Sequence, residues 1–344
     1  MRKEVLAVGC ALMVFCGCGK NNAAQHYEGG WAAMGKKDYT TAVNEFQQVI
    51  DQNSRLAESY RAEGIAYYSE KAYPEAIAAF SRSLNNMDDP DKEFKKDVQF
   101  YLAQARMDYG EVDKAIEVYS EILKAGEDEQ AFFLRGKAYI SMEDYKNAEK
   151  DFQRALEGCE DYNLYINIYQ IYVDHNKAVD GDAYLKMALE LEPQDGEDCY
   201  HRGRIYEYEK NYEAARDELK TAMEQGYEDA MLLLGRVYLE MEDPASARSM
   251  YQEYLQKSEQ GAKAYNGLAM CDIYDGAYDS ALENIAQGLK ENSKEDEQGL
   301  LYNEIVAYEY KRDFATAKEK MKIYLEQYPE DEAALRENEF LSTR

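Results

Sequence analysis

Proline and histidine are scarce in this chain of 344 residues, which contains five prolines and three histidines. Few prolines favour a largely helical protein, because proline removes a backbone donor and breaks a helix interior. The histidines have no partner at the HExxH or HxH spacing of metal sites. The GxSxG, GxGxxG and P-loop motifs of common enzymes are also missing. We therefore predict no catalytic residues, no metal site, no cofactor and no enzymatic activity.

Basic residues are also few relative to acidic ones. The chain carries 68 acidic against 40 basic residues, which gives a formal net charge of −28. This balance argues against nucleic acid as a partner, since phosphates require clusters of Lys and Arg, and it disfavours adsorption to anionic lipid. Two interpretations of the charge stay open: a solvated outer surface that keeps the protein soluble, or steering of a basic partner.

Long apolar runs are absent from the sequence except near its beginning. Residues 5–16 form one uninterrupted run of apolar, Gly and Cys residues, short for a membrane span and typical of an export signal. The pair Gly17-Cys18 that follows resembles the processing site of a bacterial lipoprotein, although Phe15 replaces the usual Leu. The resemblance implies a signal peptide over residues 1–17, a lipid on Cys18 and a location outside the cytoplasm. An ordinary cleaved signal or an uncleaved anchor is the alternative.

Cysteine chemistry is not expected in the remainder of the chain. If Cys18 begins the mature protein, the other cysteines are Cys159, Cys199 and Cys271. Their number is odd, and they are widely separated with no CxxC spacing. A disulfide framework or a zinc site is therefore improbable, and we interpret these residues as small apolar side chains.

One pattern recurs about nine times with a period near 34 residues. A small residue is followed by an aromatic three positions later, then by Ala, a large apolar residue and another small residue. The second copy reads Gly64, Tyr67, Ala76, Phe80 and Ser83. The first position of the pattern falls at Gly30, Gly64, Ala103, Gly136, Tyr169, Gly203, Gly235, Ala269 and Ile305. Such a period indicates stacked helical hairpins and not one closed core.

These residues resemble the tetratricopeptide repeat family, whose unit has Gly or Ala, Tyr, Ala, Phe and Ala at the same offsets. The resemblance implies an all-α, right-handed α-solenoid of about nine hairpins over residues 27–331. Residues 18–26 would be the lipidated Cys and a polar spacer, and residues 332–344 a C-terminal capping helix. The fifth copy is degenerate, and residues 91–95 are inserted before the third. We expect changes of superhelical curvature at both places.

In the family, positions 5 and 9 of the first helix of each repeat line a concave groove that holds peptide ligands. We carry these positions over residue by residue. The predicted groove residues are Tyr27, Trp31, Arg61, Phe100, Phe133, Lys137, Tyr200, Arg204, Arg236, Asn266 and Tyr302. The aromatic members suit anchors for an extended chain or for sugar rings.

Positions 5 and 9 hold four cations and no acid, although acids dominate the chain. We therefore expect a positive seam that binds carboxylate-bearing segments, since Arg grips a carboxylate with two hydrogen bonds. The alternative is that these cations pack on neighbouring helices and pair with local acids. No repeat combines Lys at position 5 with Asn at position 9, so the pattern differs from the chaperone-tail-binding members of the family.

Together these features predict a non-catalytic scaffold, anchored by lipid outside the cytoplasm, with a peptide or protein partner in its groove. A glycan- or cell-wall-binding lipoprotein is the alternative, because groove aromatics can stack on sugars. A structural assembly factor of the cell envelope is a third possibility. The identity of the partner does not follow from the fold.

Overall fold

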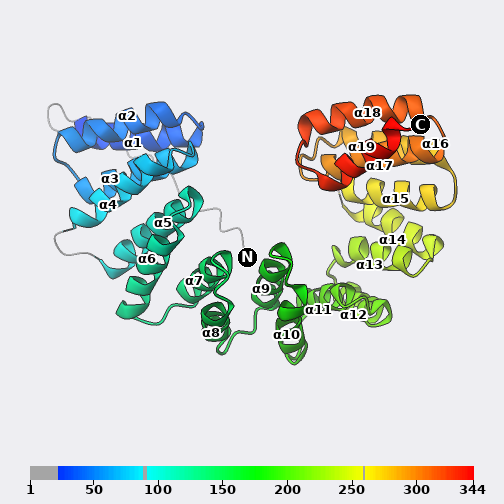
Figure 1. The fold of residues 1–344 in the computed structure, drawn as a ribbon, viewed down its shortest axis with the longest axis horizontal. Helices are drawn as coiled ribbons and strands as arrows, with labels where there is room; N and C mark the ends of the chain where they lie inside the picture. Colours follow the sequence, from blue (N-terminus) through cyan, green and yellow to red (C-terminus); the bar gives the residue numbers. More distant parts are fainter. Residues whose placement is uncertain (1–21, 88–90, 259) are drawn as a thin grey trace. The chain divides into compact units, whose positions relative to one another are not determined.

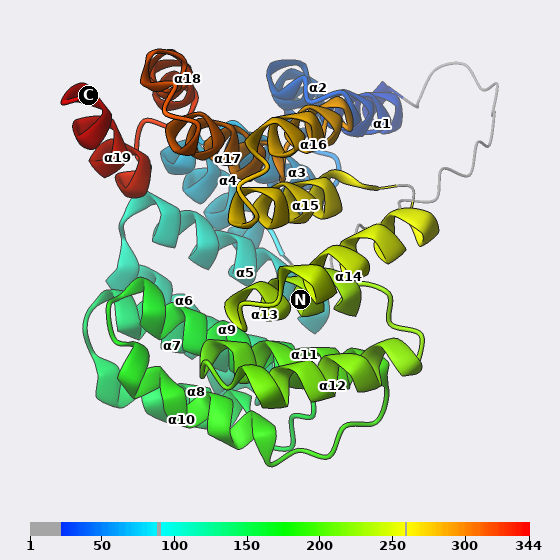
Figure 2. The ribbon, with the colours of Figure 1, turned by 90° about the vertical axis from the view of Figure 1, so that its right-hand side faces the viewer.

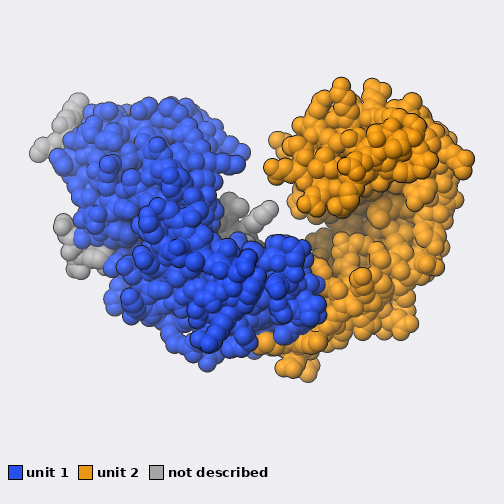
Figure 3. Space-filling model, viewed as in Figure 1, with its two compact units in different colours: residues 1–184 blue, residues 185–344 orange. Residues whose placement is uncertain are grey.

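The computed structural model describes residues 22–87, 91–258 and 260–344, which form nineteen helices (Figure 1). The chain divides into two compact units, Met1–Tyr184 and Leu185–Arg344 (Figure 3). The first unit contains α1 (Asn22–Gly35), α2 (Tyr39–Asp51), α3 (Leu56–Ser69), α4 (Tyr73–Asn85), α5 (Lys92–Tyr109), α6 (Val112–Ala125), α7 (Glu129–Ser141), α8 (Tyr145–Ala155) and α9 (Tyr162–Asp174). The division falls within α10 (Ala178–Leu189).

The second unit continues with the remaining hairpins and ends in a single helix. It contains α11 (Gly196–Tyr208), α12 (Tyr212–Glu224), α13 (Ala230–Glu240), α14 (Pro244–Lys257), α15 (Ala262–Tyr274), α16 (Tyr278–Lys290), α17 (Glu297–Tyr310), α18 (Phe314–Gln327) and α19 (Glu332–Ser342). None of the helices in the described part of the chain is long and apolar enough to cross a membrane.

Consecutive helices pair as antiparallel hairpins, as α11 and α12 show (Figure 2). The main contacts of a helix are with helices next to it, or next but one, in sequence. The predicted all-α fold of about nine hairpins is therefore confirmed. The final helix, α19, buries Ala334 and Leu341 against α17 and α18, so the predicted cap is also present.

The small residue that opens each sequence motif marks the closest approach of the two helices in a hairpin. At Gly64 a Cβ atom would lie 2.6 Å from the ring of Phe80, and at Gly136 it would lie 2.7 Å from the ring of Phe152. At Gly203 a Cβ atom would lie 2.7 Å from the side chain of Leu219. The large residue of the motif thus fills the space above the glycine, and this contact sets the geometry of the hairpin.

The turns inside the hairpins share a left-handed residue, and several also have a capping side chain. One residue of the turn adopts a left-handed conformation, with φ of 59° at Glu143 and 57° at Lys210. The side chain of Asp144 or Asn211 then accepts a hydrogen bond from a backbone N–H in the first turn of the next helix. These caps satisfy donors that the helix itself leaves unpaired.

The two irregular places in the sequence are accommodated locally. In the fifth hairpin Tyr169 occupies the position that is usually small, and Gly181 of α10 stands where the motif has Ala; a Cβ on Gly181 would lie 3.1 Å from the Tyr169 ring. The insertion at 91–95 does not form a loop. Asp91 caps α5 and accepts a hydrogen bond from the backbone of Glu93, and the inserted residues lengthen α5 to 18 residues.

The spacer predicted over residues 18–26 is too long. The first helix begins at Asn22, because Ala23, Ala24 and Gln25 favour helix. His26 also connects this first turn to α2. The Nδ1 atom of His26 lies 2.6 Å from the Glu45 carboxylate on α2. Residues 1–21, which include the predicted signal and Cys18, lie outside the described residues.

The seventh and eighth hairpins share one unusually tight contact. The ring of Tyr251 on α14 fits between two glycines, Gly235 of α13 and Gly267 of α15. A Cβ at these glycines would lie 2.6 and 2.3 Å from the ring carbon that bears the hydroxyl. Tyr251 is only 4% exposed. The glycine at 267 therefore makes room for the tyrosine at the large position of the seventh hairpin.

We expect Gly267→Ala to destabilise the second unit by about 1–3 kcal/mol, the usual cost of overpacking a core. The Tyr251 ring cannot move away from the new methyl group, because Gly235 of α13 lies against it. Urea unfolding followed by circular dichroism measures the change. Gly35→Ala is the control, since no atom lies within 4 Å of its Cβ position. Adding Tyr251→Leu to Gly267→Ala should restore most of the loss; failure to do so would contradict this account.

Candidate functional site: a pocket in the second unit

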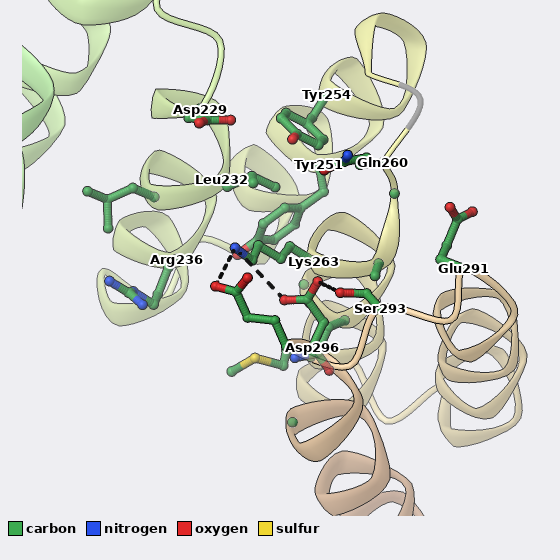
Figure 4. Close-up of a pocket in the computed structure, with 18 of the residues that line it drawn as sticks. Asp229, Leu232, Arg236, Tyr251, Tyr254, Gln260, Lys263, Glu291, Ser293 and Asp296 are labelled. Atoms are coloured by element: carbon green, nitrogen blue, oxygen red, sulfur yellow. Dashed lines mark hydrogen bonds and ion pairs between the residues drawn. The ribbon is translucent and has the colours of Figure 1, made fainter. Parts of the chain in front are cut away.

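A pocket of about 760 Å³ opens in the second unit (Figure 4). The helix that carries Leu232 and Arg236 borders it, and so does the loop that carries Ser293 and Asp296. It is formed mainly by the first helices of successive hairpins, α11, α13, α15 and α17, with two tyrosines from α14. The lining residues are Tyr200, Asp229, Leu232, Leu233, Arg236, Tyr251, Tyr254, Gln260, Gly261, Ala262, Lys263, Asn266, Gly267, Met270, Glu291, Ser293, Glu295, Asp296 and Gly299.

The loop between α16 and α17 contributes acidic groups to the pocket. The Lys263 ammonium lies 3.7 Å from a Glu295 oxygen and 3.9 Å from an Asp296 oxygen, longer than a hydrogen bond. The Ser293 hydroxyl donates a hydrogen bond of 2.6 Å to Asp296. These groups are drawn together in Figure 4. Asp296 is therefore fixed, whereas Lys263 is held loosely.

Arg236, the other cation of the pocket, is already engaged. Its Nε and Nη2 atoms donate hydrogen bonds of 2.6 and 2.7 Å to the two carboxylate oxygens of Glu207 on α11. Burial lowers the pKa of the Arg236 guanidinium, but the bonds to Glu207 outweigh burial and raise it. The planar guanidinium is thus matched to a carboxylate of the preceding hairpin. Its charge is neutralised within the protein.

Tyr200 lies in an aromatic and cationic part of the same pocket. Its ring is 4.9 Å from the ring of Tyr227 and 5.4 Å from that of His201, and the Arg204 guanidinium lies 5.9 Å from its centroid. Burial raises the pKa of the Tyr200 hydroxyl, although Arg204 opposes the shift. Tyr200 therefore remains a neutral hydrogen-bonding group at physiological pH.

Family models of the tetratricopeptide repeat match four stretches of the sequence. One matches residues 27–91, 200–262 and 232–297, and a second matches residues 129–161. Together these stretches cover more than half of the chain and coincide with the observed hairpins. The chain belongs to the tetratricopeptide repeat family. Members of this family are typically non-catalytic scaffolds for protein–protein interaction.

Several solved tetratricopeptide repeat structures resemble the chain at low overall similarity. YrrB, described as having an unusual peptide-binding site, is 26% identical with a TM-score of 0.36, over 55% of this chain and 97% of that one. A Parabacteroides merdae repeat protein is 16% identical with a TM-score of 0.45, over 83% and 99%. Yeast Tom70 is 15% identical with a TM-score of 0.49, over 89% and 78%. Comparison with curated proteins gave no match.

The repeat positions predicted for the groove are partly brought together in the second unit. Tyr200, Arg236 and Asn266 all line the pocket, and Arg204 lies beside Tyr200. The Oδ1 atom of Asn266 accepts a hydrogen bond of 2.8 Å from Asn303 on α17. Tyr302 does not line the pocket.

In the first unit the predicted aromatics are half-buried and pack on the large residues of their hairpins. Ring centroids of Trp31 and Tyr27 lie 5.5 and 5.8 Å from Phe46. Phe100 lies 6.3 Å from Tyr119, and Phe133 lies 6.1 Å from Phe152. Tyr302 of the second unit packs in the same way, 5.8 Å from Tyr324. Each ring therefore contributes to the packing of its hairpin.

The expectation of four available cations needs correction. Arg61 donates a hydrogen bond to Asp97 on the next hairpin and lies over the ring of Tyr101, and Arg236 is bound to Glu207. Local pairing, the alternative left open by the sequence, therefore holds for both. Lys137 is exposed and forms no salt bridge with a described residue.

Sequence reasoning missed most of the pocket, because it considered only two positions of each first helix. Tyr251 and Tyr254 come from a second helix, and Glu295 and Asp296 come from a link between repeats. One signal was present in the sequence: Gly267 adds a second small residue just before Ala269, which indicates a bulky neighbour. Among the described residues, no group of His, Cys, Asp and Glu side chains is arranged to hold a metal ion.

Proposed function

We propose that this chain is a membrane-tethered scaffold that binds an extended segment of a partner protein along the first helices of its hairpins. The supporting observation is the pocket of about 760 Å³ in the second unit. It combines aromatic rings, hydrogen-bonding side chains and ion-paired charges contributed by consecutive repeats. A few polar groups within a partly apolar concave surface are typical of binding sites for extended ligands.

The tether is the lipid proposed for Cys18, which would place the repeats outside the cytoplasm. The support comes from the sequence alone: the apolar run at 5–16, followed by Gly17-Cys18. Because α1 begins at Asn22, only three residues separate Cys18 from the first helix. Such a short connection would hold the first hairpin close to the bilayer surface.

A carboxylate-bearing segment remains the proposed ligand in the first unit, where it would meet Lys137. This ammonium is exposed, and Phe133 lies one turn before it on α7, so an apolar anchor and a cation share one helix surface. Arg61 is less suitable, because Asp97 already occupies its guanidinium.

Crosslinking from membranes tests the proposal on the full-length protein. We expect Lys137→Glu to abolish crosslinking of the partner, because the substitution places a carboxylate against a carboxylate. The matched control is Lys150→Glu, an exposed lysine on the second helix of the same hairpin, which should leave crosslinking intact. Cys18→Ala should move the protein out of the membrane fraction.

The outcomes separate the parts of the proposal. Membrane retention of Cys18→Ala would contradict the lipid tether. Equal effects of Lys137→Glu and Lys150→Glu would contradict the Lys137 contact. Retention of the protein on cell-wall polysaccharide, with no protein crosslinked, would favour the glycan-binding alternative.

A further inference from the structure

The charges of the second-unit pocket are unbalanced. Four carboxylates line it, those of Asp229, Glu291, Glu295 and Asp296. Two cations line the pocket, of which Arg236 is neutralised by Glu207. Arg204 lies at the border beside Tyr200, so the acids still outnumber the cations. Asp229 and Glu291 form no salt bridge with a described residue. An incoming carboxylate would therefore meet net repulsion here, and an incoming cation net attraction.

Two tyrosines of α14 add hydroxyl groups to the pocket. Tyr251 and Tyr254 are 4% and 7% exposed and line the pocket. Neither hydroxyl makes a hydrogen bond with a described residue. Neither oxygen is among the buried side-chain atoms that lack a partner, so both hydroxyls are reached from the cavity and can form hydrogen bonds with a ligand or with water there. Phenol oxygens accept hydrogen bonds from ammonium and guanidinium groups, and the ring faces attract cations.

We infer that this pocket binds a basic side chain, Lys or Arg, of an extended segment of the partner protein. The charged end would lie among Asp229, Glu295 and the tyrosine hydroxyls. Its methylene stem would contact Leu232 and Met270, since long basic side chains bury their stems on apolar surface. The inference rests on the proposed function. It assigns a positively charged ligand group to the second unit, whereas the group proposed to bind Lys137 is negatively charged.

The test uses the full-length protein in detergent and short fluorescent peptides in which alanine alternates with lysine, glutamate or glutamine. Fluorescence anisotropy at physiological ionic strength should show tightest binding of the lysine peptide. The double variant Asp229→Asn, Glu295→Gln should weaken that binding by about tenfold or more, since it removes charge-assisted hydrogen bonds. Tyr251→Phe keeps the ring between its glycines and should weaken binding severalfold, with an unchanged unfolding temperature.

A matched control separates the pocket from the general acidity of the chain. The variant Glu224→Gln, Glu228→Gln removes the same charge from two exposed residues that do not line the pocket, and binding should stay within about twofold. Equal weakening by both double variants would overturn the inference. So would tighter binding of the glutamate peptide, or equal binding of the glutamine peptide.

These results also distinguish the two proposals. If the lysine peptide does not bind but Lys137-dependent crosslinking persists, the pocket inference fails and the scaffold stands. If the lysine peptide binds through Asp229 and Glu295 but no protein partner is crosslinked, the pocket chemistry stands and the scaffold proposal fails.

Discussion

Replacing Phe152 with alanine should destabilise the first unit by about 3–5 kcal/mol, the range for removing a fully buried aromatic side chain. Phe152 is completely buried on α8 and fills the space above Gly136. Its ring also lies 6.1 Å from that of Tyr172 on α9 and 5.9 Å from that of Tyr184 on α10. The substitution therefore removes a contact within the fourth hairpin and the ring that joins it to the fifth.

Because each repeat is stabilised by its neighbours, loss of this ring should also reduce cooperativity. We expect urea unfolding to show a lower midpoint and a broader or split transition. Phe340→Ala is the control, since this ring on α19 is 40% exposed, and it should cost less than about 1 kcal/mol. Similar losses for the two variants would show that Phe152 does not join the hairpins.

The second large effect is expected at Asp151, which neighbours Phe152 in sequence. The Asp151 carboxylate is almost fully buried and accepts hydrogen bonds of 2.7 Å from Nε and from Nη2 of Arg135. Asp151→Ala would leave the guanidinium with a single bond, to the Ser120 hydroxyl. An unpaired buried charge is costly, so we expect a loss of about 3 kcal/mol, measured by thermal or urea unfolding.

The control uses an exposed ion pair that also involves α8. Glu127 pairs with Arg154, and both side chains are largely exposed, so Glu127→Ala should cost less than about 1 kcal/mol. Combining Asp151→Leu with Arg135→Leu should recover most of the stability, because an apolar pair of similar size can replace a buried ion pair. If the double variant were as unstable as Asp151→Ala, lost packing and not the unpaired charge would be responsible.

The sequence was sufficient to predict the hairpins and the cap. The contact between Gly64 and Phe80 joins two residues at a fixed separation within one repeat, so it recurs with the motif. The same holds for the turn at Glu143 and its capping residue Asp144. These features depend on local geometry that every repeat shares, and periodicity alone reveals them.

The site was less predictable, because its contacts cross between repeats at variable separations. Arg61 reaches an acid 36 residues ahead, whereas Arg236 reaches one 29 residues behind. Neither distance is a multiple of the period, and a long side chain has many rotamers that compete. The contact of Tyr251 with Gly235 and Gly267 likewise involves three helices, so the pattern of a single repeat does not predict it.

The restriction of contacts to nearby helices has a consequence for how the chain folds. The main partners of a described helix lie within two helices of it in sequence, so these contacts do not depend on a distant segment. Proteins with such local contacts have low contact order and fold quickly. A hairpin can form once its own helices and the preceding ones have been synthesised. The order of synthesis can thus become the order of folding.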